Sequence, residues 1–133
     1  MSLLRQPLLM LARSGAIKNV VSTMPVSSGI VHSYVPGETT RAAVDATAGL
    51  VADGLTVTLD FLGEDTLDRA QADATAAAYV ELLEALAARD LARSAEVSVK
   101  LSAVGQMLPG VGEGVALEHA RTICRAARNA GTT

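Results

Sequence analysis

Apolar and polar residues alternate along two short stretches of the chain, residues 55–61 and 96–102. In both stretches the odd-numbered positions are apolar and the even-numbered positions are mostly polar or charged. A period of two with β-branched residues predicts a β-strand with one covered face and one polar face. The predicted covered face consists of Val57, Leu59, Phe61, Val97, Val99 and Leu101.

Between and around these strands the apolar positions recur at helical spacing, which predicts helices over about 41–53, 66–89 and 113–129. Thr39 or Thr40 is expected to cap the first helix, and Gly54 and Gly131 are expected to end the first and the last. The alanine-rich middle helix has an apolar stripe of Tyr79, Leu82, Leu83 and Leu86. On the last helix we expect a core side of Leu117, Ala120, Cys124 and Ala127, with His119 facing solvent.

The predicted order is helix, strand, helix, strand, helix, preceded by an amphipathic helix over 3–13 and a weakly helical stretch over 16–34. Two strands about forty residues apart with a long helix between them form a βαβ unit, so the strands are expected to be parallel with a right-handed crossover. Thr132 and Thr133 look like the first step of a third strand. We therefore expect an α/β fold, with residues 1–54 as an N-terminal helical segment and residues 55–133 as two βα units.

Composition narrows the class of protein. The chain of 133 residues is 50% hydrophobic but only 2% aromatic, so its core must be aliphatic. A formal charge of −3 argues against a nucleic-acid partner, which usually requires a basic excess. The single cysteine excludes an intrachain disulfide and a cysteine zinc site, and it favours a cytoplasmic location. No stretch has the roughly 20 apolar residues that a membrane-spanning helix needs.

The carboxyl ends of the two strands are the places where chemistry is expected, because ligands bind there in barrels and in doubly wound sheets. Asp60 and Glu64 belong to the carboxyl end of the first strand and Lys100 to that of the second, so a lysine and two carboxylates should meet at one edge. A lysine facing a closed interior needs a partner or an anionic ligand. Structural alternatives also exist: Lys100 could protect an edge strand or pair with Asp60, and the carboxylates could cap the next helix.

The glycines at 110–114 lack both the spacing of a dinucleotide-binding turn and the Lys-Ser/Thr of a phosphate loop, so we expect only a loop there. No metal cluster and no Ser-His-Asp or Cys-His arrangement is visible in the sequence.

Three motifs nevertheless resemble those of monofunctional bacterial proline dehydrogenases. They are Leu59-Asp60-Phe61-Leu62-Gly63-Glu64, the run from Val97 to Gln106, and the preceding Tyr34-Val35-Pro36-Gly37-Glu38-Thr39. Their order and spacing match the N-terminal part of that family over nearly the whole chain.

This resemblance implies the N-terminal part of a distorted (βα)8 barrel that binds FAD. It also implies oxidation of L-proline to Δ1-pyrroline-5-carboxylate, with a hydride passing to the flavin N5 and electrons passing on to a membrane quinone. The family's lysine maps to Lys100, which would pair with the substrate carboxylate. Its glutamate maps to Glu64, which would form a gating ion pair with an arginine. Asp60 would contact the residues that bind the substrate and not the substrate itself. A cytoplasmic enzyme is implied, with peripheral association at the inner face of the membrane left open.

The family's later features have no counterpart in these residues: the third-strand aspartate, the flavin-binding residues and the arginine pair of the final helix. We therefore expect the 133 residues alone neither to hold FAD nor to oxidise proline. Two other classes stay open, a self-contained α/β binding or interaction module and a barrel enzyme that forms a Schiff base on Lys100. The oligomeric state, the flavin-binding residues and the quinone cannot be derived from the sequence.

Overall fold

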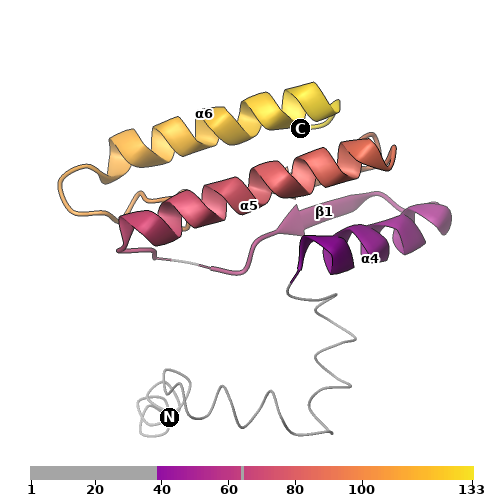
Figure 1. The fold of residues 1–133 in the computed structure, drawn as a ribbon, viewed down its shortest axis with the longest axis horizontal. Coiled ribbons are helices and arrows are strands. Elements are labelled where there is room, and N and C mark those ends of the chain that lie inside the picture. The colour runs from indigo at the N-terminus through magenta and orange to yellow at the C-terminus, as the bar shows by residue number, and fades with distance from the viewer. Residues whose placement is uncertain (1–38, 64) are drawn as a thin grey trace, which may run out of the picture. The chain divides into compact units, whose positions relative to one another are not determined.

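The computed structural model describes residues 39–63 and 65–133. Within them the chain forms an α/β unit with three helices and two parallel strands (Figure 1). In chain order the elements are α4 (Thr40–Ala52), β1 (Val57–Asp60), α5 (Arg69–Ala88), β2 (Ala95–Ser98) and α6 (Gly112–Ala130). This order confirms the alternation expected from the sequence. The two helical stretches predicted over 3–13 and 16–34 lie outside the described residues, as does Glu64.

Side-chain caps and glycines set the helix ends. Thr39 accepts a hydrogen bond from the Ala42 N–H at 3.2 Å and caps α4, as expected from its sequence position. The Asp68 carboxylate accepts one from the Gln71 N–H at 2.8 Å at the start of α5. Gly131 ends α6 with φ of +87°, a left-handed conformation that glycine adopts without strain, and this confirms the predicted C-cap.

Strands β1 and β2 pair in parallel, with Val57 opposite Ala95 and Asp60 opposite Ser98. Helix α5 makes the crossover between them, as a βαβ unit requires. Both strands are shorter than the alternating patterns of the sequence, which ran over 55–61 and 96–102. Beyond the strands, the side chains of Phe61 and Leu101 are each 44% exposed, so these two residues do not join the covered face as expected.

The helices cover one face of this two-stranded sheet. Val97 and Val99 pack against a core cluster that includes Tyr79 and Leu83 of α5. Val57 and Leu59 pack against a second cluster, formed by Val44, Leu86, Leu91 and Ala95. The strand residues that alternate with these valines and Leu59 are exposed: Thr58, Asp60, Glu96 and Ser98. The predicted division into an apolar covered face and a polar open face is therefore confirmed for the strands themselves.

Helices α5 and α6 lie side by side, and α4 packs on α5 and β1 (Figure 1). The expected core side of α6 was right at Ala127 but wrong at Leu117 and Cys124, because the buried face is rotated by about one residue. Its buried residues are Gly112, Val115, Ala116, His119, Ile123 and Ala127, whereas Leu117 is 51% exposed and Cys124 is exposed. The expectation came from the apolar spacing of Leu117, Ala120, Cys124 and Ala127, which left His119 on the polar side. His119 is buried instead, because both of its ring nitrogens find oxygen partners.

The last two residues lie against β2. The Val97 N–H donates to the Thr133 carbonyl at 3.2 Å, and the Thr132 hydroxyl donates to the Ala95 carbonyl at 2.5 Å. No strand is assigned to Thr132 and Thr133. Their contacts nevertheless place this segment along the edge of β2 that β1 leaves open, where the expected third strand would pair.

Candidate functional site

The carboxyl ends of β1 and β2 bring an acidic and a basic side chain together. Asp60 is the last residue of β1, and Lys100 follows β2 by two residues. The Lys100 Nζ lies 3.4 Å from the Asp60 Oδ2, with the side chains 45% and 34% exposed respectively. The meeting of lysine and carboxylate at one edge, expected from the sequence, is present. Both groups are still open enough to contact a ligand.

The loops that follow the two strands are joined to each other. The Thr66 N–H donates to the Ser102 carbonyl at 3.1 Å, and Thr66 is buried. Within the second loop, the Ala103 N–H donates to the Lys100 carbonyl at 3.0 Å. Ala103 and Val104 are almost fully buried, so the backbone next to Lys100 is firmly anchored.

Two glycines allow this second loop to pack closely under α6. Gly105 has φ of +109°, and an added Cβ would lie 2.7 Å from the Val115 side chain. At Gly112 a Cβ would lie 2.1 Å from the Gln106 carbonyl oxygen. Gly112 therefore serves the close approach of the first turn of α6 to the loop, which gives the glycine-rich stretch a packing role.

Tyr79 of α5 is the residue that the sequence reasoning missed as part of this site. It is 1% exposed, and its ring packs in the core while its hydroxyl reaches the strand ends. The Phe61 N–H donates to the Tyr79 Oη at 3.0 Å, and the hydroxyl lies 2.7 Å from the Ser98 carbonyl and 3.2 Å from the Asp60 Oδ1. The sequence does carry a signal, because a buried tyrosine normally needs a hydrogen-bond partner for its hydroxyl.

Burial raises the pKa of Tyr79 above its ordinary value of 10.0. The nearby Asp60 carboxylate acts in the same direction, because it disfavours a second negative charge. The Phe61 N–H and the Lys100 ammonium act the other way, by stabilising the phenolate. The net result is a neutral phenol that keeps its proton for donation to an oxygen at the strand ends.

A second polar network fixes the far side of the Lys100 loop. The His119 Nδ1 lies 2.8 Å from the Val104 carbonyl oxygen, and its Nε2 lies 3.0 Å from the Asp73 Oδ1. The same Asp73 oxygen accepts from the Arg69 Nε at 2.7 Å. The hydrogen bond from Arg69 is the main reason why the pKa of Asp73 is lowered. This network connects α5, α6 and the loop after β2.

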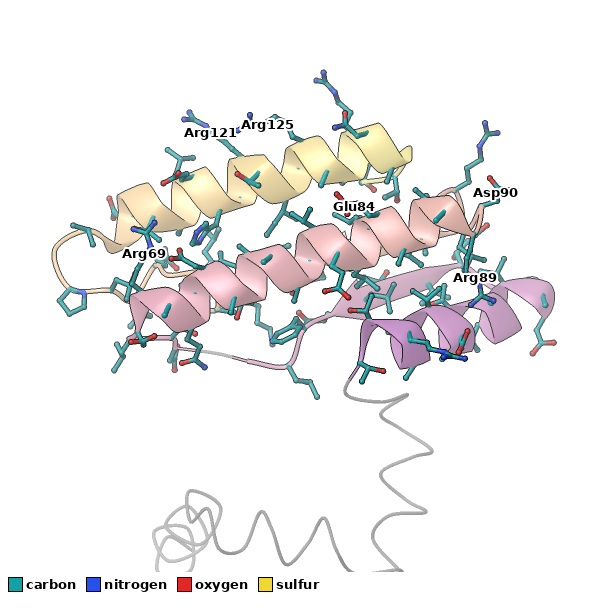
Figure 2. All side chains as sticks on the ribbon, viewed as in Figure 1. Arg69, Glu84, Arg89, Asp90, Arg121 and Arg125 are labelled. Carbon is teal, nitrogen blue, oxygen red and sulfur yellow. The ribbon has the colours of Figure 1, made fainter. Side chains whose placement is uncertain are left out.

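Basic side chains on the outer face of α6 are not part of the site. Arg121 lies on the exposed face of α6, Arg125 lines the hollow between α6 and α5, and Arg89 reaches from the end of α5 to Asp45 of α4 (Figure 2).

The described residues contain no group of three side chains suited to hold a metal ion. One hollow in the described part lies between α5 and α6 and another at the amino ends of the strands, and neither of these includes Asp60, Lys100 or Tyr79. We assign none of the described residues to FAD. Among the same residues, no helix is long and apolar enough to cross a membrane.

Comparison with known proteins identifies relatives of one kind. The chain is 34% identical over 102 residues to a protein of Deinococcus radiodurans named "Proline dehydrogenase", an alignment that covers 77% of this chain and 32% of the relative. It is 33% identical over 95 residues to "Proline dehydrogenase 1" of Bacillus subtilis, covering 71% of this chain and 30% of the relative. No protein-family model matches the chain.

The fold and the strand-end pair define an α/β unit of the kind that places its chemistry at the carboxyl ends of parallel strands. Over about three quarters of its length the chain is similar to part of proteins named proline dehydrogenase. The resemblance expected from the three sequence motifs is thereby confirmed. The chain spans about a third of the length of the curated relatives it matches.

Proposed function

We propose that this chain contributes the Lys100 side of the substrate site in an enzyme that oxidises L-proline to Δ1-pyrroline-5-carboxylate. Two independent observations support the proposal. The curated relatives carry the name proline dehydrogenase, and Lys100 lies at a strand carboxyl end next to Asp60. The position of Lys100 just beyond the carboxyl end of β2, with its side chain 45% exposed, is the single structural observation on which the proposal rests most.

Lys100 is proposed to bind the carboxylate of proline. Its ammonium has three donors, so it can keep its contact with Asp60 and also donate to an incoming carboxylate. Nearly half of the Lys100 side chain is exposed, so the ammonium is accessible without rearrangement of the fold. Asp60 then has two roles: it orients the lysine, and it balances a positive charge when no substrate is bound.

The proposal includes a larger architecture than the described unit. Residues 55–133 are proposed to form the first two βα units of a distorted (βα)8 barrel, preceded by the helical segment of residues 1–54. The contact between the Val97 N–H and the Thr133 carbonyl supports this, because it carries the parallel ladder past β2. The open polar face of the sheet would then look into the barrel. Glu64 is proposed to pair with an arginine as a gate, by resemblance alone.

FAD is proposed as the hydride acceptor and a membrane quinone as the final electron acceptor, both by resemblance. The 133 residues alone are proposed neither to retain FAD nor to oxidise proline. The share of the relatives that the chain spans, about a third of their length, supports this. A flavin absorption band in the purified 133-residue chain would contradict this part of the proposal.

The experiment that tests the function compares proline with pyrrolidine, which lacks the carboxylate, in the flavin-loaded holoenzyme to which this chain contributes. A charge-assisted hydrogen bond contributes about 1.5–3 kcal/mol, so Lys100→Met should raise KM for proline roughly 10- to 100-fold. The oxidation of pyrrolidine should stay unchanged. Arg121→Met is the matched control, because Arg121 points into solvent from α6, and it should affect neither substrate.

Each alternative has its own outcome in this experiment. A wild-type enzyme that does not oxidise proline would overturn the proposed function. An equal loss with both amines would assign Lys100 a structural role, as in a self-contained binding module. Covalent trapping of a carbonyl substrate on Lys100 by borohydride would favour the Schiff-base enzyme. The Asp60 carboxylate argues against that last class, because it stabilises the charged ammonium whereas a Schiff base needs the neutral amine.

A further inference from the structure

The hydrogen-bond ladder between β1 and β2 is interrupted at the strand ends by one side chain. At the amino ends, the Val57 N–H donates directly to the Ser94 carbonyl at 2.9 Å. In a parallel ladder the equivalent bond four residues further on joins the Phe61 N–H to the Ser98 carbonyl. Instead, the Phe61 N–H donates to the Tyr79 Oη, which lies 2.7 Å from the Ser98 carbonyl oxygen. The hydroxyl thus takes the place of a ladder bond.

This insertion explains why both strands end before their alternating sequence patterns do. The backbone groups that would continue the pairing are bound to Tyr79, so the chains separate after Asp60 and Ser98. Phe61 and Leu101, although placed by sequence on the covered face, leave it at this point. Asp60 and Lys100 are located where the strands part.

We propose that Tyr79 is a positioning residue of the proline site: its hydroxyl, inserted between β1 and β2, holds one oxygen of Asp60 so that the other meets Lys100. The inference rests on the proposed function, since it takes Lys100 as the group that binds the substrate carboxylate. The geometry gives each oxygen of Asp60 a separate task. Oδ1 lies 3.2 Å from the Tyr79 hydroxyl, and Oδ2 lies 3.4 Å from the Lys100 ammonium.

The phenol suits this task because it has both donor and acceptor capacity. It accepts from the Phe61 N–H and has one proton to share between the Ser98 carbonyl and Asp60. Its ring is anchored in the core beside Leu83, and the ring of Phe61 lies 6.1 Å away at a tilt of 54°. Since burial raises the pKa of Tyr79, the proton is retained across the working range of an enzyme.

The test is Tyr79→Phe in the flavin-loaded holoenzyme, read as a split between KM and kcat. Loss of a neutral hydrogen bond should raise KM for proline about 2- to 10-fold, while kcat stays within about 2-fold. Oxidation of pyrrolidine, which has no carboxylate for Lys100, should be unaffected. The matched control is Thr75→Val, which removes another buried hydroxyl from α5, one that donates to the Gln71 carbonyl away from the site. It should leave KM for proline unchanged.

A merely structural tyrosine predicts a different pattern. Damage to the fold lowers the active fraction, so kcat would fall equally for proline and pyrrolidine while KM for both stayed the same. That result, or an unchanged KM for proline in Tyr79→Phe, would overturn the inference. If Tyr79→Phe does not fold, Asp60→Asn must show the same rise in KM that is specific for proline, and its absence would have the same meaning.

The positioning claim can also be judged without any activity, in the complete 133-residue chain. Carboxyl carbon NMR shifts report the hydrogen bonding of Asp60, and Tyr79→Phe should move the Asp60 resonance while Thr75→Val should not. An Asp60 resonance that does not respond to Tyr79→Phe overturns the inference. If the wild-type holoenzyme fails to oxidise proline, the proposed function fails. The NMR comparison then decides separately whether Tyr79 holds Asp60.

Discussion

The eight residues of β1 and β2 point alternately to the two faces of the sheet, and the two faces depend on different interactions. On the covered face, aliphatic side chains of the strands pack against Leu83 and its neighbours in the helices. On the open face, polar side chains contact one another: Thr58 donates to Glu96 at 3.0 Å, and the Asp60–Lys100 pair lies just beyond. The comparison separates what makes this unit stable from what gives it a candidate chemistry.

Tyr79 is the residue that takes part in both. Its ring belongs to the helix-side core, and its hydroxyl ends the strand pairing where the polar groups gather. A core residue therefore controls the geometry of the site, so stability and function are not fully separable at this position. Three changes, in order of decreasing effect, test how far the separation holds.

The largest effect is expected from a cavity on the covered side. Leu83→Ala removes a side chain that is 0% exposed in the main core, and such truncations cost about 2–5 kcal/mol. Chemical denaturation of the 133-residue chain should show this loss as a lower midpoint. Thr58→Val on the open face is the contrast, and it should change the free energy of unfolding by less than about 1 kcal/mol. Equal losses for the two variants would show that the faces do not differ as described.

An intermediate effect is expected on α6, where the structure reverses the assignment made from the sequence. His119→Leu leaves the buried Val104 carbonyl without its imidazole partner, which should cost about 1–3 kcal/mol. Cys124→Ala on the exposed face of the same helix should change stability by less than about 0.5 kcal/mol. Both values come from denaturant unfolding at neutral pH. A larger loss of stability for Cys124→Ala than for His119→Leu would show that α6 buries the Cys124 side, as the sequence suggested.

The smallest effect is a pH dependence at Tyr79, where the two faces meet. Because the pKa of Tyr79 is raised in the folded chain, the neutral phenol is favoured by folding more than the phenolate is. Its contribution to stability is complete below the unfolded value of 10.0 and is lost as the pH rises through the folded pKa. Stability measured between neutral pH and the alkaline range should therefore fall less steeply in Tyr79→Phe than in the wild type. Parallel curves for the two proteins would contradict the raised pKa.

Several features were predictable because they depend on neighbours in the chain. The order of elements, the alternating faces at Val57–Leu59 and Val97–Val99, and the caps at Thr39 and Gly131 all follow local patterns. The meeting of Asp60 and Lys100 also followed, because the carboxyl ends of parallel strands share one edge. The expected role of Glu64, which lies outside the described residues, stays a prediction.

The sequence-based predictions were wrong where contacts between residues far apart in the chain determine which side chains are buried and where a strand ends. On α6, apolar side chains occur on more than one face, and periodicity alone favoured the side of Cys124. The buried side includes His119, because Val104 and Asp73 supply oxygen partners from outside the helix. The strand ends were misplaced for a similar reason. Alternation continues in the sequence to Phe61 and Leu101, and nothing local indicates that a tyrosine eighteen residues further on will bind the Phe61 N–H.

The sequence by itself thus determined which segments form helices and strands, which face of each strand is apolar, and that Asp60 and Lys100 lie at one edge of the sheet. These properties depend on the spacing of apolar side chains and on chain connectivity, which can be read from residues close together in the sequence. The tertiary structure alone decided the rotation of α6, the burial of His119 and the end of the strand pairing at Tyr79. Each of these depends on whether a buried polar group finds a partner from another element, and only the folded arrangement supplies that partner.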